Sequence, residues 1–323
     1  MSSAPTVVVV HAHPDDEAIF TGLLIRRLAD QGGRVVLVTA TGGELGEPCT
    51  GEDGASLAAV RRRELERACA LLGVARLVSL GRRDSGVPGS TDHDHARALV
   101  RSHRPALARR VADLAIAEGA AAIVYDDRGG IYGHPDHLTA HAIGAQAARL
   151  AGTSGYEVTV DRDQLDGTDH LVTRAAAWLG GTSFGTAFGT RWHEIGLALH
   201  GTAPERAAKH AAMAAHSSQI SSGELAGVAF DRLYGTEWLT RAHGPAVLDA
   251  LGRIPPGHLQ SHRHLAAGRP GGCATTQPST DPSTRSASHP LSLPLSHPLS
   301  HTSFPPPTRP LGRPHRRFTH VPS

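Results

Sequence analysis

Short runs of β-branched residues alternate with helical segments through the first 150 residues of this 323-residue chain. Strands are expected at 7–10, 34–39, 76–80 and 121–125. Helical spacing of apolar residues is expected over 18–30, 57–72, 99–118 and 138–150. Strands that are apolar on both faces, each followed by a helix, belong to a parallel sheet that helices cover on both sides. The sequence therefore predicts an α/β, Rossmann-like fold with a mostly parallel sheet.

The pattern is weaker after residue 150. Residues 156–160 alternate as in a strand, and 194–199 resemble a further strand. Residues 204–215 have helical spacing, with a proline in the first turn. These elements either extend the sheet or cap its ligand-binding end.

A Pro-, Ser- and His-rich segment ends the chain. The last 54 residues hold 12 of the 22 prolines and include the repetitive stretch HPLSLPLSHPLSH. Such a composition supports neither a helix nor the interior of a sheet. We therefore predict one folded domain over residues 1–265 and a disordered tail over 266–323. A Pro-rich ligand for an adaptor protein is the alternative to a linker-like extension.

Charge and cysteine content exclude several classes of protein. The net charge is +2, but residues 270–323 hold five arginines against the single acid Asp281, so the preceding body is net negative and no basic nucleic-acid face is expected. Cys49, Cys69 and Cys273 are too few and too far apart for a disulfide framework or a CxxC metal site. The run VVVV is too short for a signal core or a membrane span. We expect a cytoplasmic protein without nucleic-acid or membrane partners; no sequence feature indicates its oligomeric state.

Two similar polar motifs follow two of the expected strands. HAHPDDE, residues 11–17, follows VVVV, and GGIYGHPDH, residues 129–137, follows AAIVY. A proline and carboxylates also suit the first turn of a helix, so either motif alone is compatible with helix capping. Ligands of open α/β sheets bind beyond the carboxyl ends of the strands, where both motifs would lie. Two His-Pro-Asp turns at one edge therefore favour a functional site.

The residue types in these motifs point to a divalent metal. His13 and Asp16 are three residues apart, as are His134 and His137, so each turn can direct two side chains toward one point. A His-Asp-His set with an open position for water is the usual form of a hydrolytic zinc site. The remaining carboxylate, Asp15, is placed to take a proton from metal-bound water. Nitrogen and oxygen ligands accept Fe²⁺ as well as Zn²⁺.

VVVVHAHPDDEAIFTG together with YGHPDH resembles the zinc-dependent PIG-L/LmbE deacetylases. The two motifs stand in the family's order, about 120 residues apart, and the resemblance extends over residues 5–242, including HSSQI at 216–220 and GTEW at 235–238. It implies three metal ligands, namely His13, Asp16 and His137. It further implies that Asp15 is the general base and that His134 stabilises the oxyanion or donates a proton to the leaving amine.

The resemblance implies more for the residues around these. Asp136 would tune His134, Tyr132 would lie over the substrate carbonyl, and His11 would have a structural or supporting role. Arg61 and Asp84 resemble the residues that bind the polyol part of the substrate. A helix-surface arginine and a turn aspartate are the alternatives for these two. Gly43 and Glu44 fall in a loop that the family places near the site.

The function implied by the resemblance is that of a metal-dependent hydrolase that removes an N-acetyl or other N-acyl group from a small amino sugar or glycoside. An amidase acting on a thiol-sugar conjugate would need the same metal core. A non-catalytic sugar- or nucleotide-binding protein is an alternative of another class, although no GxGxxG follows the first strand. Residues 160–205, which help to shape the substrate pocket in the family, match no motif, so the sequence does not predict the particular substrate.

Overall fold

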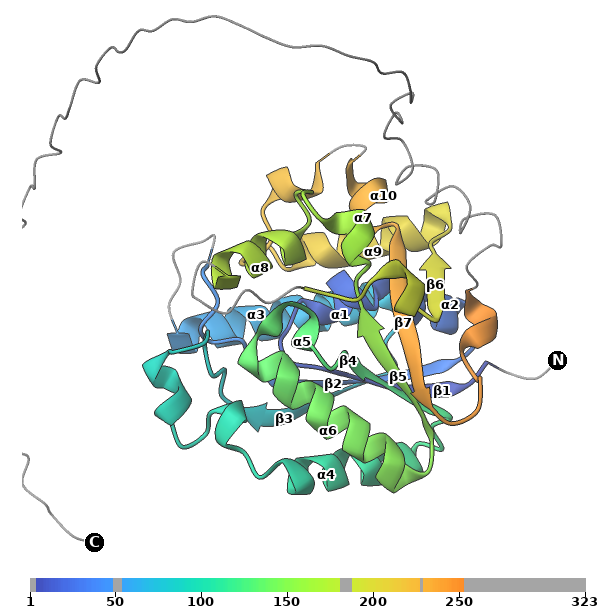
Figure 1. The fold of residues 1–323 in the computed structure, drawn as a ribbon, viewed down its shortest axis with the longest axis horizontal. Coiled ribbons are helices and arrows are strands. Elements are labelled where there is room, and N and C mark those ends of the chain that lie inside the picture. The colour runs from blue at the N-terminus through green and yellow to red at the C-terminus, as the bar shows by residue number, and fades with distance from the viewer. Residues whose placement is uncertain (1–3, 49–53, 181–187, 227–228, 253–323) are drawn as a thin grey trace, which may run out of the picture. The chain divides into compact units, whose positions relative to one another are not determined.

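The computed structural model describes residues 4–48, 54–180, 188–226 and 229–252. A seven-stranded sheet with the spatial order β3-β2-β1-β4-β5-β7-β6 forms its centre (Figure 1). The strands are β1 (Thr6–His11), β2 (Arg34–Thr41), β3 (Arg76–Arg82), β4 (Ala122–Asp126), β5 (Ser154–Thr159), β6 (Leu197–His200) and β7 (Thr236–His243). The first five run parallel, whereas β7 pairs antiparallel with both β5 and β6. The predicted α/β fold is confirmed; the predicted disorder of 266–323 lies outside the described residues.

Helices cover both faces of this sheet. They are α1 (Asp16–Phe20), α2 (Gly22–Asp30), α3 (Gly54–Leu72), α4 (Arg104–Ala117), α5 (Gly130–Gly133), α6 (Pro135–Ala151), α7 (Arg162–Leu165), α8 (Leu171–Gly180), α9 (Ala203–Ala215) and α10 (Ala229–Tyr234). Short 3₁₀ turns occur at Thr91–Asp94, Leu99–Arg101, Trp192–Glu194, Ser222–Leu225 and Asp249–Leu251. Helices α2, α3 and α9 lie on one face, and α4 and α6 lie on the other (Figure 1). Within the described ranges, no helix has the length and apolar character needed to cross a membrane.

Strand β1 shows why the sheet is covered on both sides. Val7 and Val9 belong to the core beneath α2 and α3, and Val8 and Val10 belong to the core beneath α4 and α6. All four side chains are fully buried. Burial of a valine side chain contributes roughly 1.5 to 3 kcal/mol. A central strand that is apolar at every position therefore requires the two helical layers.

Two expected helices begin or divide differently in the structure. The segment expected to be helical over 18–30 consists of α1 and α2, separated at Thr21, whose φ is −134°. The Thr21 hydroxyl lies 3.0 Å from His11 Nε2, so a tertiary contact accompanies the break. The segment expected over 99–118 is a 3₁₀ turn followed by α4, which carries a proline in its first turn. Proline favours an extended residue before it and thus a helix start at this place.

The weaker second half mostly extends the sheet. Strands β5 and β6 match the segments expected at 156–160 and 194–199, and α9 matches 204–215. Strand β7 and helix α8 were not predicted from the sequence. Strand β7, the last strand within the described residues, lies between β5 and β6 at the sheet's antiparallel end.

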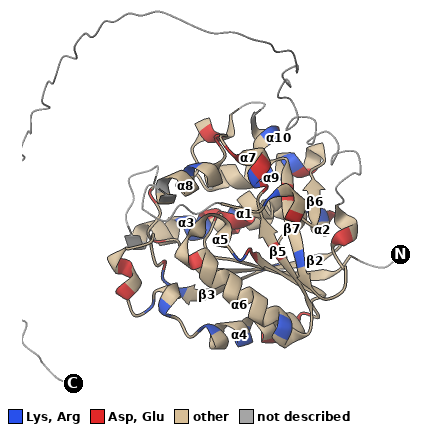
Figure 2. Ribbon diagram, in the orientation of Figure 1, with Lys and Arg blue, Asp and Glu red and all other residues tan. Residues whose placement is uncertain are grey.

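Charged residues of both signs are interspersed over the helices and loops (Figure 2). Acidic and basic residues both occur on α2, α3 and α10.

The order of the strands creates a switch point at the centre of the sheet. The chain passes from β1 outward to β2 and β3, then returns to the other side of β1 as β4. The connections after β1 and β4 consequently diverge beyond the carboxyl ends of two adjacent strands. Crevices at such points are the usual ligand sites of open α/β sheets. HAHPDDE follows β1 and GGIYGHPDH follows β4, so the fold brings the two motifs together.

Candidate active site

Each motif contains one residue in an unusual backbone conformation. Asp15 has φ 98° and Ile131 has φ 58°, and they are the two non-glycine residues with positive φ in the described ranges. Side chains disfavour this region, and such a residue costs of order 1 to 3 kcal/mol unless its surroundings hold it there. Strain of this kind is concentrated at functional sites. Each of the two motifs at the switch point contains one residue strained in this way.

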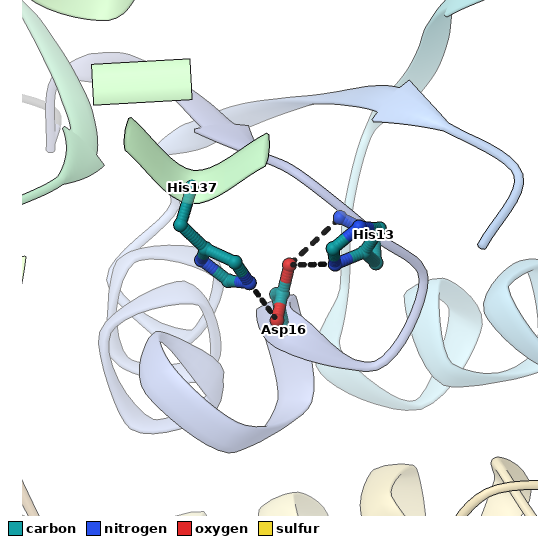
Figure 3. Close-up of side chains that lie close together, drawn as sticks. All are labelled: His13, Asp16 and His137. Carbon is teal, nitrogen blue, oxygen red and sulfur yellow. Dashed lines mark hydrogen bonds and ion pairs between the residues drawn. The ribbon is translucent and has the colours of Figure 1, made fainter. Parts of the chain in front are cut away.

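His13, Asp16 and His137 converge on one point (Figure 3). His137 Nε2 lies 3.5 Å from Asp16 Oδ1, and His13 Nδ1 lies 3.8 Å from Asp16 Oδ2. The backbone N–H of His13 also donates to Asp16 Oδ2 at 2.7 Å, which fixes the carboxylate between the rings. All three residues are buried, and one donor atom from each lies within 4.8 Å of the others.

This donor set fits a divalent metal. Two ligands bound at zinc distances to a tetrahedral ion are about 3.3 Å apart. The imidazole nitrogens lie 3.5 and 3.8 Å from the two different oxygens of Asp16, and one donor atom of each residue lies within 4.8 Å of the others, so a small adjustment would bring all three to these distances. Two imidazoles and one carboxylate leave a coordination position for water or substrate, as in hydrolytic zinc centres, and they also suit ferrous iron.

Asp126, the last residue of β4, contacts the ring nitrogen of His137 that faces away from Asp16. One of its carboxylate oxygens lies 2.8 Å from His137 Nδ1, at ion-pair distance but not as a well-aligned hydrogen bond. The other oxygen lies 2.8 Å from Nδ1 of His11, whose Nε2 contacts Thr21. Burial would raise the pKa of the Asp126 carboxyl, but the charges of His137 and His11 hold it well below its ordinary value. His11 therefore contacts Asp126, which in turn contacts the candidate ligand His137. This position is consistent with the supporting role that the family resemblance implies for His11.

The sequence interpretation did not include Asp126. The available signal was an acidic residue ending a buried strand, AAIVYD, at the edge where the motifs lie. Carboxylates that orient metal-binding histidines through the second ring nitrogen are a regular feature of metal sites.

The Asp136 side chain contacts His13, whereas its backbone contacts His134. Its Oδ2 lies 3.2 Å from His13 Nε2 and accepts the backbone N–H of Ser85 at 3.0 Å. Its own backbone N–H donates to His134 Nδ1 at 3.2 Å. The carboxylate was expected to tune His134, and its charge does raise the His134 pKa against the larger effect of burial; its hydrogen bond also orients the His13 ring. Asp84 Oδ2 lies 3.8 Å from the same His13 nitrogen.

His134 is poised as a neutral hydrogen-bond donor. Burial, together with the nearby His13 and His137, lowers its pKa well below the ordinary histidine value. Because Nδ1 accepts a hydrogen bond, the proton of the neutral ring belongs on Nε2. Tyr132 lies near His134, and its hydroxyl is 3.3 Å from His137 Nε2.

Arg61 lies against the expected base. It is 4% exposed, and its guanidinium is 3.1 Å from Asp15 Oδ2. It also donates to the carbonyl oxygens of Gly43, at 2.8 Å, and Pro14. Burial raises the pKa of Asp15 to about 6, although the Arg61 charge opposes this effect. Arg61 is thus a buried partner of the base as well as a wall residue of the cleft.

A cleft of about 790 Å³ opens above these residues. The residues of the two motifs that line it are His13, Asp15, Asp16, Tyr132 and His134. Its walls include a polar side with Arg61, Asp84, Ser90 and Asp92, and an apolar side on α8 with Leu171, Val172, Ala175 and Leu179. The segment 160–205, which matched no motif, therefore contributes one wall through α8.

Asp84 is held at the cleft by backbone hydrogen bonds. Its Oδ1 accepts from Gly86 N at 2.8 Å, and its Oδ2 accepts from Leu45 N at 3.4 Å. Glu44 accepts the Asp84 N–H at 2.9 Å. Glu44 thus joins the loop after β2 to the loop that carries Asp84.

The chain is similar to proteins of one family. The family model for PIG-L, GlcNAc-PI de-N-acetylase, matches residues 8–148. A 1D-myo-inositol 2-acetamido-2-deoxy-alpha-D-glucopyranoside deacetylase of Nocardia farcinica is 37% identical over 246 residues, which cover 67% of this chain and 80% of that protein. The enzyme of the same name from Thermobifida fusca is 34% identical over 275 residues, with coverage of 74% and 93%.

Two solved structures share the fold. The N,N'-diacetylchitobiose deacetylase of Pyrococcus horikoshii has 21% sequence identity and a TM-score of 0.50, and the match covers 79% of this chain and 89% of that one. A teicoplanin deacetylase in a zinc-inhibited form has 19% identity and a TM-score of 0.50, with coverage of 74% and 100%. The sequence relatives, most of whose length this chain spans, show that it belongs to the PIG-L family of de-N-acetylases.

Proposed function

We propose that the protein is a zinc-dependent N-deacetylase whose substrate is an N-acetylglucosaminyl glycoside of inositol. The observation that carries the proposal is the convergence of His13, Asp16 and His137 beside the strained Asp15 at the switch point of the sheet. The proposed substrate is supported by relatives at 34 to 40% identity that are named as deacetylases of this inositol glycoside.

The cation would be held by His13, Asp16 and His137, with Asp126 and Asp136 orienting the two imidazoles from behind. When bound, it would polarise the amide carbonyl and lower the pKa of water at the open position. Ferrous iron would supply the same chemistry through the same ligands.

Asp15 would act as the general base. Its carboxylate lines the cleft next to the ligand Asp16, and a pKa of about 6 leaves it ionised yet basic near neutral pH. A base whose pKa is close to the working pH combines the required protonation state with useful proton affinity. It would take a proton from the attacking water and deliver it to the leaving amine.

His134 would stabilise the oxyanion that forms on the amide oxygen. Its neutral ring presents Nε2–H, and its buried position removes competition from bulk water. Loss of one such donor typically costs about 3 to 4 kcal/mol of transition-state stabilisation. Tyr132, whose hydroxyl lies beside the ligand nitrogen of His137, is the second candidate donor.

The sugar and its polyol substituent would lie along the polar wall. Asp84 is buried at the cleft, its carboxylate already fixed by backbone N–H groups, and carboxylate oxygens bind sugar hydroxyls well. Arg61 would contribute through its position beside Asp15, because most of its guanidinium is engaged by protein groups.

The first test is metal content in protein purified without chelator. The wild type should hold about one equivalent of zinc or iron, and His137→Ala should hold much less. His141→Ala is the matched control, since His141 lies one turn further along α6 and contacts the Asp126 carbonyl. A metal-free wild type that takes up no added zinc would contradict the proposal.

The second test is acetate release from N-acetylglucosaminyl inositol. Asp15→Ala should keep its metal while kcat falls by about 10²- to 10⁴-fold, as expected for loss of a general base. Asp92→Ala, at a half-buried residue that lines the cleft, should change KM rather than kcat. Unchanged turnover in Asp15→Ala would remove this residue as the base, and the absence of wild-type turnover would refute the proposed substrate.

A further inference from the structure

One peptide group in the first motif is held from two sides. The N–H of the Pro14–Asp15 peptide donates to Glu17 Oε2 at 3.0 Å, and its carbonyl oxygen accepts from the Arg61 guanidinium. This peptide plane is one of the two that define φ of Asp15, which is 98°. The contacts to Glu17 and Arg61 therefore constrain the unusual conformation of the base.

The support on the Glu17 side comes from a distant part of the chain. His216 Nε2 lies 2.7 Å from Glu17 Oε1, and both side chains are fully buried. His216 directly follows α9, 199 residues after Glu17. The Glu17 carboxylate thus has one oxygen on the Asp15 N–H and the other on the His216 ring.

The same segment also reaches the helix that carries Arg61. Glu64, three residues after Arg61 on α3, accepts the backbone N–H of Ser218 at 2.9 Å and its hydroxyl at 2.6 Å. Ser217 donates to the same carboxylate at 3.2 Å. Residues 216–218 therefore contact both elements that hold the Pro14–Asp15 peptide.

We infer that His216 is a positioning residue for the general base, acting through Glu17 on the Pro14–Asp15 peptide. This inference rests on the role proposed for Asp15. His216 does not line the cleft and contacts none of the proposed metal ligands, so its effect on turnover would pass through the base. The family model ends at residue 148, so this support comes from outside the matched region.

The test is a double-mutant cycle between His216→Ala and Asp15→Ala. In the wild-type background, His216→Ala should lower kcat by about 10- to 100-fold, because small displacements of a catalytic group have effects of that size. KM and metal content should stay within about twofold, since the cleft and the ligands are retained. In the Asp15→Ala background, the same substitution should have almost no further effect on kcat.

Two further variants separate positioning from general destabilisation. His216→Gln keeps a hydrogen-bond donor toward Glu17 and should recover most of the activity. If His216→Ala does not fold, His216→Gln replaces it in the test. Glu17→Ala, which removes the acceptor, is then the variant expected to be inactive. His210→Ala removes a histidine from α9, the helix that precedes His216; His210 contacts the Leu225 carbonyl and Phe230, and its loss should leave kcat unchanged.

A crystal structure of His216→Ala gives a readout that does not depend on substrate. Asp15 should leave the positive-φ region or become disordered, even if N-acetylglucosaminyl inositol is not the substrate. Equal losses of kcat in the two backgrounds, loss of metal, or an unchanged Asp15 conformation would each overturn the inference. Absence of turnover in the wild type would instead refute the proposed substrate alone.

Discussion

Asp126 illustrates how a single carboxylate can set the properties of two histidines. It lies between His11 and His137 and is completely buried, with one carboxylate oxygen 2.8 Å from each ring, so a single charge acts on both histidines. A carboxylate on the far nitrogen of a metal-binding imidazole fixes the tautomer and raises the basicity of the ligating nitrogen. The metal affinity of the site should therefore depend on a residue that does not touch the metal.

Asp126→Ala should weaken zinc binding by about 10- to 100-fold, the usual effect of losing such a carboxylate. Competition with a chromophoric chelator at fixed pH measures the change in Kd. Asp127→Asn is the matched control, because this neighbouring buried carboxylate caps the Gly129 and Ile131 amides and contacts no histidine. An unchanged Kd in Asp126→Ala would show that His137 is oriented by its packing alone.

At the residue scale, the sequence predicted those site residues that belong to a recognisable motif. The spacing in HAHPDDE and HPDH predicted that His13, Asp16 and His137 would converge, and the structure brings them together. Asp126 and His216 could not be predicted in this way. Their contacts join residues 115 and 199 positions apart, and only the paired strands and packed helices bring them together.

At the scale of elements, the apolar spacing of the sequence failed to predict a helix boundary where a side chain has a tertiary contact. The apolar spacing over 18–30 is continuous, yet the helix divides at Thr21, whose hydroxyl contacts His11. Helix α8 was missed although it forms one wall of the cleft. Its first turn depends on His170, which lies just before it and accepts the Val172 N–H at Nδ1, 3.1 Å away. A histidine in this role is a less common start signal than Ser, Thr, Asp or Asn.

His170 should make the fold sensitive to acid. Burial, with a smaller contribution from Lys209, lowers its pKa from 6.5 to about 3. The folded state thus binds this proton less readily than the unfolded state. The stabilising effect is complete above about pH 6.5 and is lost progressively as the pH falls toward 3.

His170→Asn keeps an acceptor for the Val172 N–H without the titrating ring. Between pH 7.5 and 5.5, its free energy of unfolding should therefore fall by about 1 kcal/mol less than that of the wild type. Urea unfolding at the two pH values measures the difference, and all other titrating groups are common to both proteins. Parallel losses in both proteins would show that the folded state binds this proton as readily as the unfolded state does.

At the scale of the whole molecule, the antiparallel end of the sheet is joined to the helical layer by one buried ion pair. Lys209 on α9 lies 2.7 Å from Glu237 on β7, and both are almost fully buried. Glu237 also accepts the N–H groups of Leu23 and Leu24, at 2.8 and 2.9 Å, in the first turn of α2. The alternation of strands and helices predicted the parallel half of the fold, but this link depends on a strand that the sequence interpretation missed.

Lys209→Met should lower the free energy of unfolding by about 3 to 5 kcal/mol, because it leaves Glu237 charged and buried without its partner. The double variant Lys209→Met/Glu237→Gln should recover much of that loss, since a neutral amide still accepts from the α2 amides at far lower desolvation cost. Urea unfolding at pH 7.5 measures both, with exposed Arg62→Met as the control for a cation in a surface pair. If the double variant were as unstable as Lys209→Met, the unpaired buried charge of Glu237 would not be the cause of the loss.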